Sequence, residues 1–216
     1  MLNLKYILIG VPITLIALTG HELAHAWVST KLGDPTPRRE GRLTLNPMAH
    51  LDLVGTILMI LTGFGWAKPV GVNPMYYRDR KKGMALTAIA GPLANLIMAF
   101  FGVIIGAILI VAGSLMGWAD GVLSVISFVI DLFVIRNLSF MVFNLIPIPP
   151  LDGSKVLGIF LPNRTYYTML QYERYAILLI MFLSLSGALD LIIGTGVSAV
   201  YTVIARLVYN IVSLIV

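Results

Sequence analysis

The sequence predicts an all-α integral membrane protein, on the evidence of its composition and of the lengths of its apolar runs. Hydrophobic residues make up 58% of the 216 residues, charged residues make up only 12%, and the mean hydropathy is +0.93. A soluble globular domain is about a quarter charged, so lipid has to be the solvent for most of this surface. We expect one membrane-embedded domain over residues 1–216, with a core at about 4–155 and accessory C-terminal helices at about 175–216.

Five apolar runs are long enough to form transmembrane helices, which need about 20 residues each. These runs cover Leu4–Thr30, Met84–Met116, Val122–Ile146, Tyr175–Ile193 and Val197–Val216. A sixth run, Leu51–Gly65, is short and contains three glycines. Its length and its glycines favour a re-entrant segment over a spanning helix.

Two short segments predict a β ribbon at the membrane surface. Thr36–Asn46 alternates weakly between polar and apolar residues, and Val70–Val72 is a short candidate strand between Pro69 and Pro74. We expect these two segments to pair with each other.

The distribution of Lys and Arg predicts how the chain crosses the membrane. The loop at about 31–83 contains nine of these residues and the loop at about 152–174 contains three, whereas the other two loops contain none. The positive-inside rule places both basic loops in the cytosol, and five crossings then put the N-terminus outside and the C-terminus in the cytosol. We therefore expect a multi-pass protein of the plasma membrane. Its net charge of +5 is explained by basic residues that interact with the headgroups of the lipid bilayer, and it does not indicate nucleic-acid binding.

The first apolar run ends in residues 21–25, HELAH, which form an H-E-x-x-H motif. Residues four apart lie on one face of a helix, so His21 and His25 can bind one metal ion, with Glu22 beside them as a general base. Lys5 marks the outer interface, and the motif begins about 24 Å further along a helix that rises 1.5 Å per residue. The motif is thus expected below the headgroups on the cytosolic half, where ionisable groups are costly and mostly functional. Placement at the headgroups for solvation alone is the competing interpretation.

A third ligand is needed, because a catalytic zinc ion takes three protein ligands and keeps one position for water. The chain contains no cysteine, so that ligand has to be His, Asp or Glu. Asp152 is the strongest candidate, since three prolines in residues 147–150 precede it and Gly153 follows it. Such residues break helical hydrogen bonding, and irregular backbone at membrane depth is tolerated where it lines a polar cavity. A turn that only ends a helix would show the same spacing, and His50 and the other acids remain alternatives.

Two motifs resemble those of a known family. Residues 144–153, NLIPIPPLDG, are similar to the N-x-x-P-x-x-x-L-D-G motif of site-2 proteases, which are intramembrane zinc metalloproteases of the peptidase M50 type. Residues 91–95, GPLAN, are similar to the G-P-x-x-N element of the same family. The resemblance covers roughly residues 14–175 and favours the small prokaryotic form without PDZ or CBS domains.

The resemblance implies one Zn²⁺ ion per chain, and its ligands would be His21, His25 and Asp152. Glu22 would be the general base, Asn144 would position the substrate or stabilise the oxyanion, and Asn95 would contact the substrate backbone. The implied reaction is hydrolysis of a peptide bond in or near the transmembrane segment of a single-pass membrane protein, as in regulated intramembrane proteolysis. An exposed strand edge of the β ribbon would capture such a substrate by strand addition.

Two other functions compete with this interpretation. A membrane metal transporter also places His and acidic residues in membrane helices, but it would need a polar path over several helices, and the last two apolar runs are nearly free of charge. A catalytically silent membrane scaffold would have no need of Glu22. The sequence is compatible with a monomer and with an oligomer.

Overall fold

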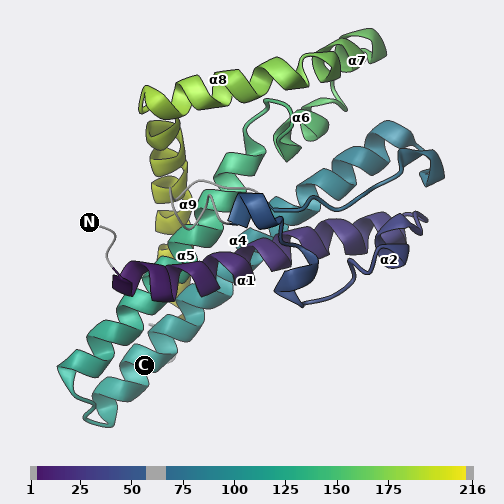
Figure 1. Cartoon of the computed structure of the whole chain (residues 1–216). Helices are drawn as coiled ribbons and strands as arrows, with labels where there is room; N and C mark the ends of the chain where they lie inside the picture. The colour runs from purple at the N-terminus through teal and green to yellow at the C-terminus, as the bar shows by residue number, and fades with distance from the viewer. Residues whose placement is uncertain (1–3, 57–66, 213–216) are drawn as a thin grey trace.

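The computed structural model describes residues 4–56 and 67–212, and within these ranges the chain is helical and contains no β-strand (Figure 1). The long helices are α1 (Leu4–Lys31), α4 (Arg80–Leu115), α5 (Asp120–Leu145) and α9 (Ala188–Val212). The shorter elements are α2 (Thr36–Arg39), α6 (Asp152–Leu157), α7 (Asn163–Gln171), α8 (Glu173–Leu185) and the 3₁₀ turns η1 (Pro47–Ala49) and η2 (Pro74–Tyr76).

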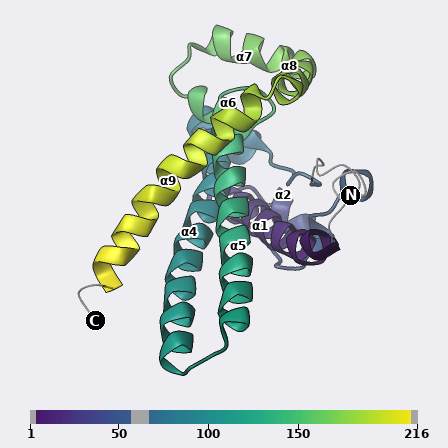
Figure 2. The same cartoon turned by 90° about the vertical axis from the view of Figure 1, so that its left-hand side faces the viewer.

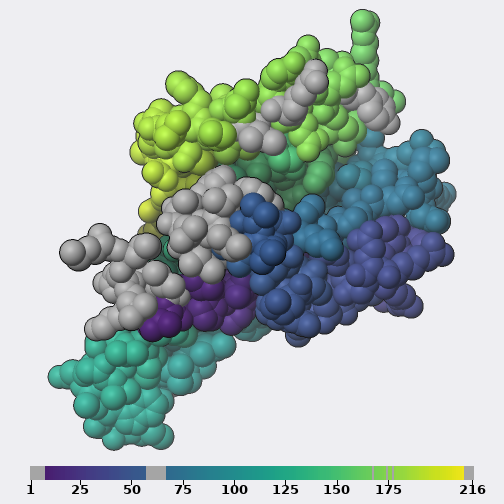
Figure 3. All heavy atoms as spheres, viewed as in Figure 1, coloured from purple at the N-terminus to yellow at the C-terminus, as the bar shows by residue number. Residues whose placement is uncertain are grey.

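The four long helices are apolar enough to cross a membrane, and no other helix in the described ranges is. The predicted all-α membrane class is therefore confirmed. α4 and α5 form a hairpin that projects from the rest of the molecule (Figures 2 and 3). The two helices approach closely because Gly106 of α4 faces Ile130 of α5, where an added Cβ would lie 2.6 Å from Ile130 Cγ2. Small residues at such contacts allow transmembrane helices to pack at short range.

The C-terminal region differs from the prediction. The expected helix Tyr175–Ile193 is divided at Gly187, whose φ of +75° ends the preceding helix. α8 has 13 residues, or about 20 Å at the helical rise, which is too short for a hydrocarbon core of about 30 Å. α9 then runs back beside α5 (Figures 1 and 2). The described residues therefore contain four helices long and apolar enough to cross a membrane, one fewer than the five predicted.

The predicted β ribbon is wrong. Thr36–Arg39 forms α2 in place of a strand, because Pro37 restricts its own φ to the helical range and Thr36 N–H donates to Asp34 Oδ1 at 2.9 Å at the start of the turn. The other predicted strand, Val70–Val72, lies in an extended segment that pairs with no strand among the described residues.

Side chains hold this extended segment, residues 67–73, in place of a partner strand. Its N–H groups donate to two carboxylates: Val70 N–H to Glu22 Oε2 at 3.1 Å, and Asn73 N–H to Asp34 Oδ2 at 2.7 Å. The segment therefore runs past the end of α1 in a position that α1 and the loop after it determine.

The predicted re-entrant run Leu51–Gly65 lies mostly outside the described residues. An antiparallel bridge joins Leu51 to Ala67, so the described residues on either side of this stretch lie together. The buried Arg42 reinforces the junction, since its guanidinium donates to the carbonyl oxygens of Ala49, Lys68 and Pro69.

A small apolar core joins α4, α5 and α9, and it consists of Ala99, Val134, Leu138, Ile204 and Val208. α1 packs against both α4 and α5, and α6 packs against α4. This arrangement brings the second half of α1, the first half of α4 and the start of α6 to one place.

Candidate metal centre

α1 presents two histidines to the helices packed against it. His21 and His25 are four residues apart and share a helix face, and both are buried, with 5% and 8% of their surface exposed. Their rings lie edge to face, with centroids 4.6 Å apart. The pair lies within Leu8–Lys31, one of the four helices able to cross a membrane, so the protein itself has to satisfy their polar atoms.

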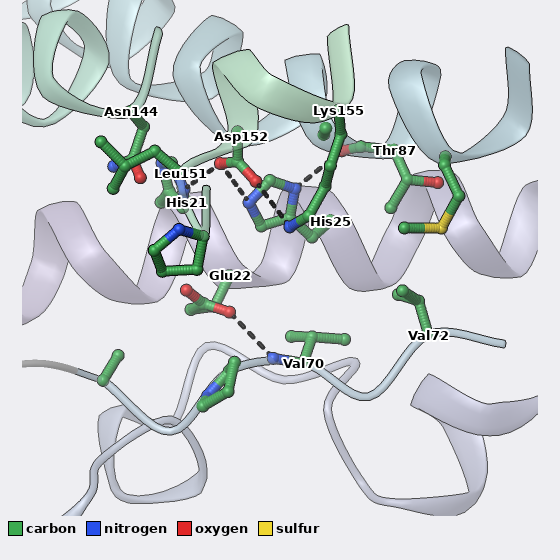
Figure 4. Close-up of a pocket in the computed structure, with 15 residues that line it drawn as sticks. His21, Glu22, His25, Val70, Val72, Thr87, Asn144, Leu151, Asp152 and Lys155 are labelled. Carbon is green, nitrogen blue, oxygen red and sulfur yellow. Dashed lines mark hydrogen bonds and ion pairs between the residues drawn. The ribbon is translucent and has the colours of Figure 1, made fainter. Parts of the chain in front are cut away.

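Asp152 completes the cluster from the first residue of α6 (Figure 4). Its Oδ2 lies 3.2 Å from His21 Nε2 and 3.1 Å from His25 Nε2. Ligand atoms that are each 2.0–2.1 Å from a tetrahedral zinc ion lie roughly 3.3 Å apart. Both separations are therefore close to those between ligands of a single zinc ion.

The carboxyl group of Asp152 is ionised in this environment. Burial by itself raises its pKa, but the hydrogen bonds with His21 and His25, together with the charges of His25 and Lys155, hold the pKa well below its usual range. Lys155 Nζ lies 3.3 Å from the second carboxylate oxygen, Oδ1. An ionised carboxylate with one oxygen facing two imidazoles is the form in which aspartate binds a metal ion.

Hydrogen bonds on the far side of both rings determine which nitrogens face Asp152. His21 Nδ1–H donates to Asn95 Oδ1 at 2.6 Å, and His25 Nδ1–H donates to the carbonyl oxygen of Thr87 at 2.7 Å. Since both acceptors are oxygens without a proton, each Nδ1 carries one, and the Nε2 of a neutral ring presents a lone pair. Two unprotonated Nε2 atoms would repel the carboxylate oxygen that they face, and either a proton that the rings donate to Asp152 or a bound metal ion relieves this repulsion. Two imidazole nitrogens and a carboxylate oxygen form a donor set that fits a metal ion such as zinc.

Gly91 of α4 leaves the space that this cluster needs. A Cβ at this position would lie 2.5 Å from His21 Nε2 and 2.5 Å from His25 Nε2, closer than real Cβ atoms approach a neighbour. Only glycine therefore lets α4 pack against the two rings without crowding the nitrogens that face Asp152.

Glu22 lies beside the cluster on the side away from Asp152 (Figure 4). One of its oxygens is within 4.8 Å of the ligand nitrogens of His21 and His25. The half-buried carboxylate accepts the N–H of Val70 at 3.1 Å. A carboxylate at this distance can exchange a proton with water beside the histidines.

A pocket of about 340 Å³ opens on the cluster. Its lining includes the polar side chains of Glu22, Asn144 and Lys155 and the apolar side chains of Pro69, Val70, Val72 and Met84. Asn144 lies at the end of α5 and donates one amide N–H to the carbonyl oxygen of Phe140 at 3.0 Å.

The structure brings most of the predicted site residues to this pocket, namely His21, Glu22, His25, Asn144 and Asp152. Asn95 lies elsewhere: it is fully buried behind His21, and its amide bonds to His21, to the Ala17 carbonyl and to Asn137. A contact between Asn95 and a substrate backbone would require these bonds to break. His50 also lies outside the pocket and donates from Nε2 to the Thr44 carbonyl oxygen at 2.9 Å.

Four further residues support the site, and sequence reasoning did not assign them a role: Thr87, Gly91, Asn137 and Lys155. The signal for Asn137 was available, because an amide side chain in the middle of a membrane-capable helix is costly and therefore informative. The signal for Lys155 was its position three residues after Asp152, which places both on one side of a helix. Thr87 acts through its backbone carbonyl, which no side-chain pattern can indicate.

Comparisons with known proteins identify relatives over most of the chain. A Bacillus subtilis protein named "Putative zinc metalloprotease YwhC" is 41% identical over 178 residues, which cover 81% of this chain and 80% of that protein. Rip2 of Mycolicibacterium smegmatis and MJ0611 of Methanocaldococcus jannaschii carry the same description and are 28% and 32% identical. Their matches cover 82% and 63% of this chain and 66% and 62% of those proteins. No family model and no solved structure matches the chain.

The relatives and the geometry agree on the metal and on the class of reaction. The names of the relatives specify zinc and proteolysis. The buried His21 and His25 and the half-buried Glu22 can hold a metal ion, and the described residues include four membrane-capable helices. With 41% identity over four fifths of both proteins, the chain belongs to this family of zinc metalloproteases and is a membrane enzyme that hydrolyses peptide bonds in proteins.

Proposed function

We propose that this chain is an intramembrane endopeptidase of the site-2 protease type, with one zinc ion held by His21, His25 and Asp152. The observation that carries the proposal is the position of the cluster. Both histidines lie in a helix able to cross a membrane, and the carboxylate reaches them from the Pro-rich break between two apolar runs. Buried ionisable groups at membrane depth are costly, so their convergence favours a reaction performed there.

The chemistry divides between the metal and Glu22. Zinc, when bound, polarises the scissile carbonyl group and lowers the pKa of water. Glu22 takes the proton from the attacking water onto its carboxylate and later delivers that proton to the leaving amine nitrogen. The hydrogen bond from Val70 N–H holds Oε2 of Glu22, so that Oε1 is left to face the reacting groups.

Asn144 acts on the substrate carbonyl group. One of its two amide N–H groups is engaged by the Phe140 carbonyl oxygen, and the second can donate to the carbonyl oxygen of a substrate in the pocket. Negative charge develops on that oxygen during attack, and a hydrogen bond aimed at it stabilises the transition state. Asn144 thus positions the substrate and stabilises the oxyanion.

The substrate is a single-pass membrane protein cleaved in or near its transmembrane segment. The apolar side chains of Pro69, Val70, Val72 and Met84 in the pocket lining suit the side chains of such a segment. A helix hides its peptide bonds in its own hydrogen bonds, so the substrate unwinds locally before attack. Cleavage releases a cytosolic fragment, as in regulated intramembrane proteolysis.

The site faces the cytosolic half of the plasma membrane. Nine of the fifteen Lys and Arg residues lie between positions 31 and 83, in the stretch that connects the metal-binding end of α1 to the start of α4. Basic loops of this kind stay on the cytosolic side and face its anionic headgroups. With four crossing helices, both chain ends then lie on the outer side.

The variant Glu22→Gln tests the proposal. In lipid vesicles that contain a single-pass model substrate, we expect the wild type to cleave within the transmembrane segment, with the position mapped by mass spectrometry. Glu22→Gln should bind as much zinc and melt at the same temperature, yet lose cleavage by about 100-fold or more, the usual contribution of general acid–base catalysis. The exposed Glu173→Gln is the matched control.

Three outcomes would contradict the proposal. If Glu22→Gln cleaves the substrate at the wild-type rate, Glu22 is not the general base. Cleavage restricted to the soluble part of the substrate rejects intramembrane proteolysis while keeping the metalloprotease. Zinc flux into sealed vesicles without any cleavage supports a transporter.

A further inference from the structure

Two asparagines lie deep in the membrane-capable helices without reaching the pocket. Asn95 of α4 and Asn137 of α5 are both completely buried, and both helices are apolar enough to cross a membrane. An amide buried among apolar groups costs free energy unless its donors and acceptors are paired. These two amides are paired with each other and with a proposed zinc ligand, which suggests a role beyond packing.

The hydrogen bonds form a chain that starts at a backbone carbonyl and ends at a histidine ring. Asn137 Nδ2 donates to the Phe133 carbonyl oxygen at 2.9 Å, which turns Asn137 Oδ1 toward Asn95. Asn95 Nδ2 donates to that oxygen at 3.0 Å and to the Ala17 carbonyl oxygen at 3.0 Å. Asn95 Oδ1 therefore faces His21 and accepts its Nδ1–H at 2.6 Å.

The direction of every bond in this chain is determined. A backbone carbonyl can only accept, so Asn137 has to present its nitrogen to Phe133 and its oxygen to Asn95. Asn95 then has to present its nitrogen to Asn137 and Ala17, and only its oxygen remains for His21. With an acceptor at Nδ1, the His21 ring keeps its proton there and leaves Nε2 free of one.

The two histidines are held in different ways. His25 Nδ1–H donates to a backbone carbonyl, that of Thr87, whose orientation the helix α4 provides. His21 depends on two rotatable side-chain amides from two helices. Asn137 and the Ala17 carbonyl together hold the Asn95 amide. Without Asn137 only the Ala17 carbonyl is left, and the amide could more readily rotate and present its nitrogen to His21, which would favour the tautomer with the proton on Nε2.

We propose that Asn95 and Asn137 are positioning residues that form a buried amide relay, which sets the tautomer and the ring orientation of His21 and thereby raises its affinity for zinc. The proposal rests on the proposed function, since it takes His21 as a zinc ligand. Asn137 acts only through Asn95. Partners of this kind around metal-binding histidines typically contribute about 10- to 100-fold to metal affinity or activity.

The test measures zinc affinity and does not depend on cleavage. The purified full chain in detergent is titrated with zinc against a competing chelator for the wild type, Asn95→Leu, Asn137→Leu and the double variant. Ser139→Ala, a second polar position on α5 outside the relay, is the control. We expect Asn137→Leu to weaken zinc binding about 10-fold or more, with the double variant no weaker than Asn95→Leu alone.

Non-additivity separates the relay from a merely structural role. If Asn137 acts through Asn95, its loss has no further effect once Asn95 is absent, whereas two independent structural losses add. The visible spectrum of the cobalt-substituted chain provides a second readout, because it follows ligand geometry and should change in Asn137→Leu. Melting temperatures confirm that each variant is folded, and Asn137→Ala replaces Asn137→Leu if the larger side chain prevents folding.

The outcomes distinguish the relay from the proposed function. A wild type that binds no zinc refutes both. A wild type that binds zinc, with a folded Asn137→Leu or Asn137→Ala that binds it equally tightly, refutes the relay alone, and additive losses in the double variant do the same.

Discussion

Replacement of Gly91 by alanine should disable the metal centre while leaving the fold intact. The new Cβ would lie 2.5 Å from Nε2 of both His21 and His25, whereas ordinary contacts begin at 3.4 Å. The two rings would therefore have to move away from α4 by about 0.9 Å. They have little freedom to do so, because Asn95 and the Thr87 carbonyl hold them at Nδ1.

This displacement is large compared with what a zinc site tolerates. Zinc–nitrogen bonds are about 2.0–2.1 Å long, and functional sites keep such distances within about 0.2 Å. A misplacement of about 1 Å in a catalytic geometry costs about 100-fold in rate. We expect Gly91→Ala to lose most of its zinc and at least about 100-fold of its peptidase activity.

The assay pairs metal analysis and cleavage with thermal unfolding. Glycine to alanine in a helix stabilises by up to about 1 kcal/mol in the absence of clashes, so loss of function through general unfolding is not expected. Gly194→Ala is the matched control, since Gly194 lies in α9 and an added Cβ there meets no atom within 4 Å. If Gly91→Ala binds zinc and cleaves substrate as well as Gly194→Ala does, the geometry argued for the metal centre is wrong.

Two further predictions concern the extended segment. Val70→Pro removes the N–H that holds Glu22. Because a hydrogen bond to a charged group contributes about 1.5–3 kcal/mol, kcat/KM should fall at least about 10-fold while the zinc content stays unchanged. Val70→Ala keeps the N–H, so equal rates for the two variants would rule out this role. Burial raises the pKa of Asp34, but the hydrogen bonds that it accepts, first among them the one from the segment, leave the pKa below its usual value. Its ionised form therefore stabilises the fold above pH 3.9, the approximate unfolded value, and this contribution disappears as the pH falls through the lower folded value. Asp34→Asn should melt below the wild type at pH 7, and the difference should shrink under acid; a constant difference in melting temperature from pH 7 to pH 3 would contradict this assignment.

The local sequence pattern was sufficient to predict features that depend on a single helix. The apolar runs predict α1, α4 and α5 to within a few residues, because burial in lipid selects for uninterrupted hydrophobic sequence. The four-residue spacing of His21 and His25 predicts their common face for the same reason. Local pattern failed at Gly187, where one glycine with a positive φ divides a continuous apolar run.

The extended segment shows why weak alternation misled the strand prediction. Strand formation needs a partner that supplies backbone hydrogen bonds along the whole edge. In this fold the carboxylates of Glu22 and Asp34 and the guanidinium of Arg42 satisfy those groups instead. These partners come from α1 and from the loop after it, and short-range periodicity carries no information about them.

The sequence by itself determined the membrane class, the H-E-x-x-H helix and the Pro-rich break, because each depends on neighbours within a few residues. Only the tertiary structure decided that Asp152 meets His21 across 131 positions of sequence, that Gly91 leaves room for the two rings, and that Asn95 turns to His21 and away from the pocket. These features depend on how three helices pack, and packing is set by the complementary shapes of surfaces far apart in the chain, which no local pattern encodes.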